Sequence, residues 1–205
     1  MATQFDPATV ISALHHRVTG ELLHLMDGLY ANIEDGLFEL AYRATEESRK
    51  RRYFDLMREM RYRKSSLVQG FARRMQQTHE QWFRPEAYRD EFDQETTSRS
   101  ARMAERCMAH FGGVLRNVAE RAAYALDGEP DVGRLPIGPR QIASNFLVTM
   151  KALRFDEHAI EIVQELFCRF VLDRLGQIYG DCNTRMQDAG FLTLAEVESL
   201  NRARA

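Results

Sequence analysis

The clearest helical pattern in this chain lies in residues 48–75, SRKRRYFDLMREMRYRKSSLVQGFARRM. When these residues are placed about 100° apart around a helix, the large apolar side chains form one stripe about 100° wide. The stripe consists of Tyr53, Met57, Met60, Leu67, Val68, Phe71 and Met75. We expect a long helix from about Ser48 to Phe83, because Pro85 disfavours helical backbone in the residue before it. Its apolar stripe is predicted to face the core.

Helical patterns continue on both sides of this segment. Asp6-Pro7 pairs a good N-cap with a proline at the first helical position and opens a helix that continues, or kinks near Gly28, as far as Ala41. Further helices are expected at about 96–126, 139–153 and 156–178, with a short last one after the capping box at 193–196. Strand patterns are nearly absent. We therefore predict an all-α bundle of about five or six helices, several of them long, with no sheet.

One segment has the composition of a linker. Residues 127–138, DGEPDVGRLPIG, hold three glycines and two prolines, so a helix must end there. A polar, acidic connection is also expected between Arg84 and Gln94. At 205 residues the chain is long enough to bury a sizeable core as one domain. We expect a single helical domain over residues 1–205, in which the linker at 127–138 separates a long-helix half from a C-terminal helical half.

Composition argues against several classes of protein. The hydrophobic fraction of 44% and the charged fraction of 28% are typical of a globular protein. No apolar run approaches the roughly 20 residues of a membrane-spanning helix, and the first ten residues lack the pattern of a signal peptide. Cys107, Cys168 and Cys182 form no CxxC pair, and their odd number argues against a closed disulfide framework. We expect a cytoplasmic protein with reduced thiols and no membrane partner.

A concentrated basic block is hidden by the net charge of −2. Residues 49–74 hold ten basic and two acidic side chains, whereas residues 1–48 hold two basic and eight acidic ones. Such a block can attract an anionic partner, or it can pair with the acidic first helix. The candidate anion or partner surface consists of Arg49, Lys50, Arg51, Arg52, Arg58, Arg61, Arg63 and Lys64. Around the helix these charges are scattered, which favours a solvated face with internal ion pairs.

Patterns for catalysis or metal binding are weak. Glu21 and His24 have the Glu-x-x-His spacing of di-iron bundles, but such sites need a second copy and two further glutamates. The sequence holds no G-x-S-x-G, P-loop or H-E-x-x-H motif. Arg102 and Arg106 have the Arg-x-x-x-Arg spacing of some cyclic-dinucleotide receptors, without the barrel that carries it there. We expect no catalytic residue, metal or cofactor, and a non-enzymatic role is favoured.

Two segments of the chain, residues 35–67 and 135–192, carry a family resemblance. The recognisable positions are Leu37-Phe38, Arg52-Tyr53-Phe54, Met57-Arg58-Glu59, Pro136 with Pro139, and Tyr179 with Asn183 and Gly190. The segments resemble the N-terminal region of a large uncharacterised proteobacterial family, a domain of unknown function that some genomes label thymidine phosphorylase. The resemblance implies a shared scaffold. Phosphorylase chemistry needs a glycine-rich phosphate cradle on an α/β scaffold, and neither is readable in this sequence.

These observations favour one class of function and keep a second open. Long amphipathic helices without a catalytic constellation predict an interaction or regulatory module that binds a protein partner, and a long helix would also suit a homodimer. The alternative is an anion-binding regulator that uses the basic helix on nucleic acid or a nucleotide messenger. It predicts binding that weakens steeply with salt, since basic side chains release counterions from such ligands.

Overall fold

The computed structural model describes residues 6–83 and 92–204. Over these ranges the chain forms seven α-helices, two short 3₁₀ turns and no strand. The elements are α1 (Pro7–Arg43), α2 (Glu47–Trp82), α3 (Gln94–Ala125), α4 (Pro139–Met150), η2 (Lys151–Leu153), α5 (Glu157–Phe170), η3 (Leu172–Arg174), α6 (Leu175–Asp188) and α7 (Leu194–Ala203). The predicted all-α bundle with several long helices is confirmed. Most of the connection predicted between Arg84 and Gln94 lies outside the described residues.

The starts of α1 and α7 follow the local capping signals. The Asp6 carboxylate accepts a hydrogen bond from the Thr9 backbone N–H, with Pro7 in the first turn of α1. At the start of α7, Thr193 and Glu196 form the predicted capping box. These starts were readable because a cap depends on neighbours three residues apart.

One predicted helix is interrupted. The apolar run expected to be a single helix over 156–178 forms α5 and α6, with the turn η3 between them. Beyond the turn, α6 packs against α3 so closely that a Cβ at Gly176 would overlap the ring of Phe111. The run is apolar on several faces because it is buried between neighbours, and that pattern does not reveal the break.

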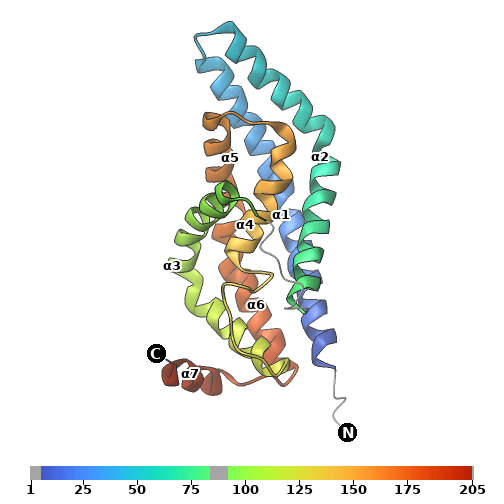
Figure 1. Cartoon of the computed structure of the whole chain (residues 1–205), viewed down its shortest axis with the longest axis vertical. Coiled ribbons are helices and arrows are strands. Elements are labelled where there is room, and N and C mark those ends of the chain that lie inside the picture. The colour runs from blue at the N-terminus through green and yellow to red at the C-terminus, as the bar shows by residue number, and fades with distance from the viewer. Residues whose placement is uncertain (1–5, 84–91, 205) are drawn as a thin grey trace.

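The other helices lie to one side of α2, which runs along the right of the view as the second arm of the long α1–α2 hairpin (Figure 1). α1 packs along α2 on one side and against α5 and α6 on the other. α4 lies between α2 and α3, and α3 also packs against α6. The short α7 makes its main contacts with α3. At the top of the view, the turn between α1 and α2 extends beyond the end of α5.

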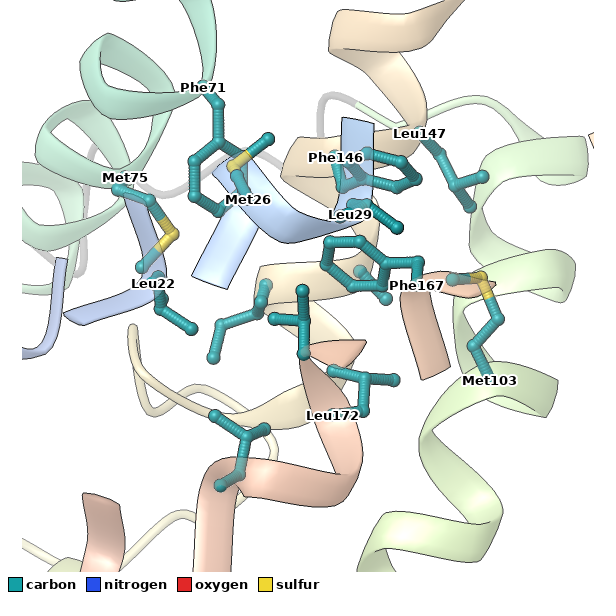
Figure 2. Packing of buried hydrophobic residues seen from close by; sticks show 14 of the residues in the cluster. Leu22, Met26, Leu29, Phe71, Met75, Met103, Phe146, Leu147, Phe167 and Leu172 are labelled. Carbon is teal, nitrogen blue, oxygen red and sulfur yellow. The ribbon is translucent and has the colours of Figure 1, made fainter. Parts of the chain in front are cut away.

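A single core cluster draws on all the long helices (Figure 2). Phe146 of α4 stacks on Phe167 of α5, with ring centroids 3.9 Å apart. The linker at 127–138 is irregular, as expected, yet its Leu135 and Ile137 are buried in this core. The buried Tyr179 hydroxyl of α6 donates to the Ile137 carbonyl at 2.8 Å. The linker is therefore packed into the core and is joined to α6 by a hydrogen bond.

Candidate interaction surface

The eight basic residues nominated from the sequence all lie in the first half of α2. Three of them pair within that helix: Lys50 with Glu47 at 3.7 Å, Arg58 with Asp55 at 3.4 Å, and Arg63 with Glu59 at 3.2 Å. All six side chains are substantially exposed. Exposed pairs of this kind contribute at most about 1 kcal/mol each, so they are easily exchanged for another partner.

Two more of the basic residues reach across to α1. The Arg61 guanidinium lies 2.7 Å from Glu34, and the Lys64 ammonium lies 2.9 Å from Asp27. The hydrogen bond and charge of Lys64 lower the pKa of the Asp27 carboxyl. The acidic first helix thus neutralises part of the basic block, as the charge distribution along the sequence suggested.

The remaining three nominated residues lie near the start of α2. Arg52 donates to the backbone carbonyl of Arg154 at 3.1 Å, which links α2 to the connection between α4 and α5. Arg49 and Arg51 are exposed and form no hydrogen bond or ion pair with any described residue. The structure therefore leaves two free cations at this end of the hairpin, and it does not gather the eight residues on one face.

Exposed aromatic side chains gather on the same hairpin. Among the described residues five large hydrophobic side chains are exposed, and three of them lie on α1 and α2. Phe38 is 53% exposed and Tyr42 is 83% exposed near the end of α1, and Tyr62 of α2 is 91% exposed. We call residues 38–54 the hairpin tip. Phe38 and Phe54 form an edge-on ring pair with centroids 6.3 Å apart, which covers part of this aromatic surface.

The base of the hairpin tip is anchored firmly. Leu37, Ala41 and Tyr53 are buried on its inner side. Burial raises the pKa of the Tyr53 phenol, and the neighbouring carboxylate of Asp156 adds to the shift. Gly36 lies against α5, where a Cβ would approach Ile162 Cγ2 at 2.9 Å. The inner side of the tip is therefore packed against the rest of the fold, while its outward side chains remain exposed.

Glu21 and His24, the pair with the Glu-x-x-His spacing, lie at the surface of α1. Glu21 and His24 line an open hollow of about 670 Å³ between α1 and α6, together with Asp27 and Asp181. Within residues 6–83 and 92–204, no group of three or more His, Cys, Asp or Glu side chains is placed to hold a metal ion.

The Arg-x-x-x-Arg motif and the cysteines are also explained by packing within the fold. Arg106 of the Arg-x-x-x-Arg motif pairs with Asp173 at 2.5 Å. Burial raises the pKa of Cys107 to about 12 and that of Cys168 to about 11, which disfavours the reactive thiolate.

Sequence reasoning missed two sets of residues. Lys151 and Arg154, in the connection from α4 to α5, lie beside the basic helix although they are about 90 to 100 positions further along the chain. Arg121 of α3 is buried and donates to the Asn183 side chain at 2.6 Å and to the Leu192 carbonyl at 3.1 Å. Neither set carries a local motif, since only the tertiary fold assembles them.

No described helix is long and apolar enough to cross a membrane.

Comparison with known proteins identifies the family of this chain. A family model described as protein of unknown function (DUF1631), N-terminal domain, matches residues 6–101 and 90–190. The chain belongs to this family. No curated protein and no solved structure matches the chain.

Several positions that carry the DUF1631 resemblance are explained by packing. Asn183 donates to the carbonyls of Val114 at 2.9 Å and Tyr179 at 3.0 Å while it accepts from Arg121. Gly190, which ends α6, has a positive φ of 89°, a conformation that glycine adopts without strain. These family positions join α6 to α3 and to the linker, so they report the scaffold of the DUF1631 domain.

Proposed function

We propose that this DUF1631 domain is a helical interaction module that binds a protein partner through its hairpin tip. The observation that carries the proposal is the exposure of Phe38 and Tyr42 on an end of the hairpin that extends beyond α5 (Figure 1). Aromatic side chains and arginine are enriched in the energetic centres of protein interfaces.

The packing of the inner side of the tip supports this proposal. A partner that binds the tip does not have to order it, because Leu37, Ala41 and Tyr53 already hold it against the core. Association therefore loses less side-chain and loop entropy than binding to a mobile segment would. The free guanidinium groups of Arg49 and Arg51 beside the aromatic residues favour a partner with an acidic rim around an apolar centre.

Fewer observations favour the alternative, an anion-binding regulator that uses the whole basic helix. Five of the eight nominated cations already pair with a carboxylate, two of them with carboxylates of α1. A nucleic acid would have to displace these weak pairs, and it would not meet the eight cations on one face of α2. A salt titration separates the two functions, because phosphate contacts weaken steeply with salt and an apolar interface does not.

Site-specific photocrosslinking tests the proposal. A photoreactive phenylalanine analogue replaces Tyr42 in one sample and Tyr124, a 59% exposed tyrosine of α3, in the matched control. We expect a protein adduct from position 42 that is absent from position 124 and persists at high salt. An adduct with a second copy of this chain would identify a homodimer.

Direct binding then checks the crosslink. Purified F38S/Y42S is titrated with the adduct partner, and Y124S serves as the control. Loss of binding by the first variant alone is expected. Equal adducts from both positions, no adduct at all, or a partner that binds F38S/Y42S normally would each contradict the proposal.

A further inference from the structure

The connection from α4 to α5 contains a residue in an unfavourable backbone conformation. Arg154 follows the 3₁₀ turn η2 with φ 47° and ψ 48°, in the left-handed region. Helices often end on a residue in this conformation, and glycine is the usual one because it has no Cβ to clash. A long charged side chain is an uncommon choice here, and its own guanidinium has no hydrogen-bond or ion-pair partner among the described residues.

Arg154 lines an open hollow of about 610 Å³ at the surface. The other residues that line this hollow are Glu59 and Arg63 of α2 and Lys151 and Ala152 of the turn. The backbone carbonyl of Arg154 is held by the Arg52 guanidinium at 3.1 Å, which fixes the turn against α2. Side chains from two distant parts of the sequence therefore meet in this hollow, and Arg52 binds the backbone of one of its lining residues.

The charges around the hollow leave an excess of positive charge. Arg63 pairs with Glu59 at 3.2 Å, and Lys151 pairs with Asp93. Both cations remain about 45% exposed. Arg52 binds only a neutral carbonyl, and Arg154 has no partner of its own. An arriving anion would find one free guanidinium and two cations whose exposed pairs are weak competitors.

We propose that this hollow binds a small molecule through its phosphate groups. Guanidinium and ammonium groups are the usual protein donors to phosphate oxygens. The volume is within the range of small-ligand sites. None of the described residues that line the hollow is aromatic, so they offer no base-stacking surface and recognition rests on the phosphates. This site is separate from the hairpin tip, and its test is independent of the proposed protein interaction.

The test is calorimetric titration of the whole chain with inorganic pyrophosphate at low salt, with chloride and sulfate as competing anions. Arg154→Gly and Arg63→Gln are each expected to weaken binding by about tenfold, the loss of one charge-assisted contact. Glu59→Gln is expected to strengthen binding about threefold, because it removes the competing carboxylate from Arg63. Arg73→Gln is the matched control, since Arg73 is an exposed α2 arginine outside the hollow.

Arg154→Gly also carries a control for folding. Glycine suits the left-handed backbone, so the thermal unfolding midpoint should stay the same or rise while pyrophosphate binding falls. The proposal is overturned if pyrophosphate does not bind, if Glu59→Gln has no effect or weakens binding, or if Arg73→Gln weakens binding as much as Arg154→Gly. The last result would mean that only the overall charge of the protein attracts the anion.

Discussion

His15 of α1 lies face to face with His79 of α2, with ring centroids 4.1 Å apart and ring planes inclined by 11°. Both imidazoles are buried, and neither nitrogen of His15 has a hydrogen-bond partner among the described residues. Burial lowers the pKa of His15 to about 3, and repulsion from His79 adds to the shift. Burial likewise lowers the pKa of His79 to about 4. Two neutral rings therefore join α1 to the far end of α2.

This pair should make the fold sensitive to mild acid. In the unfolded chain both histidines titrate near pH 6.5. Their contribution to the free energy of unfolding is therefore fully present above that pH and is lost as the pH falls toward 4. Each contributes up to about 1.4 kcal/mol per pH unit in that window.

His15→Phe removes one of the titrating rings, and a neighbouring cavity of about 30 Å³ gives the extra ring atom room. Urea unfolding at pH values of about 7, 6 and 5 should show a shallower decline than in the unsubstituted protein. The same substitution at the exposed His24 is the control. Equal declines in all three proteins would refute the role of the pair.

Two glycines of α6 should respond in opposite ways to alanine. A Cβ at Gly176 overlaps the Phe111 ring, whereas nothing lies within 4 Å of a Cβ at Gly180. We expect Gly180→Ala to stabilise the protein by about 0.5–1 kcal/mol, the helix-propensity gain. Gly176→Ala should destabilise it by about 1–3 kcal/mol, because the ring must move. Chemical denaturation measures both, and adding Phe111→Leu should recover most of the loss at position 176.

The Asn183 side chain should be important for stability. Its amide contacts Arg121, Val114 and Tyr179 at the junction of α3 and α6. Asn183→Ala leaves the buried Arg121 without its side-chain acceptor, so we expect a loss of about 2–4 kcal/mol in the free energy of unfolding. Asn201→Ala, which removes a single contact from α7 to Asn117, is the matched control with a loss of about 1 kcal/mol or less. Equal losses in guanidinium denaturation would show that the Asn183 network is not central.

Substitutions at two positions of α1 should distinguish a residue needed for folding from one available for binding. Leu37 is fully buried and Tyr42 is 83% exposed on the same helix. Leu37→Ala should cost about 2–5 kcal/mol, whereas Tyr42→Ser should change stability by no more than about 0.5 kcal/mol. Thermal unfolding with circular dichroism tests both. A large loss with Tyr42→Ser would indicate that this tyrosine is a structural residue and not a binding residue.

Local and periodic signals were enough to predict the helices. The spacing of Tyr53, Met60 and Phe71 predicted the inner face of α2, and all three are buried. The Asp6 and Thr193 caps were predictable because a side chain and the backbone that it caps are close neighbours in sequence. The density of basic residues at 49–74 was likewise visible without a structure.

The amino-acid sequence alone thus determined the fold class, the helical faces and the basic block, since each depends on residues within a few turns of one another. Only the tertiary structure decided that Arg61 pairs with Glu34, that α6 packs against α3 where Gly176 meets Phe111, and that Arg154 lies beside α2. These contacts link residues far apart in the chain. Their partners are selected by how the helices pack, and neither periodicity nor charge density encodes that selection locally.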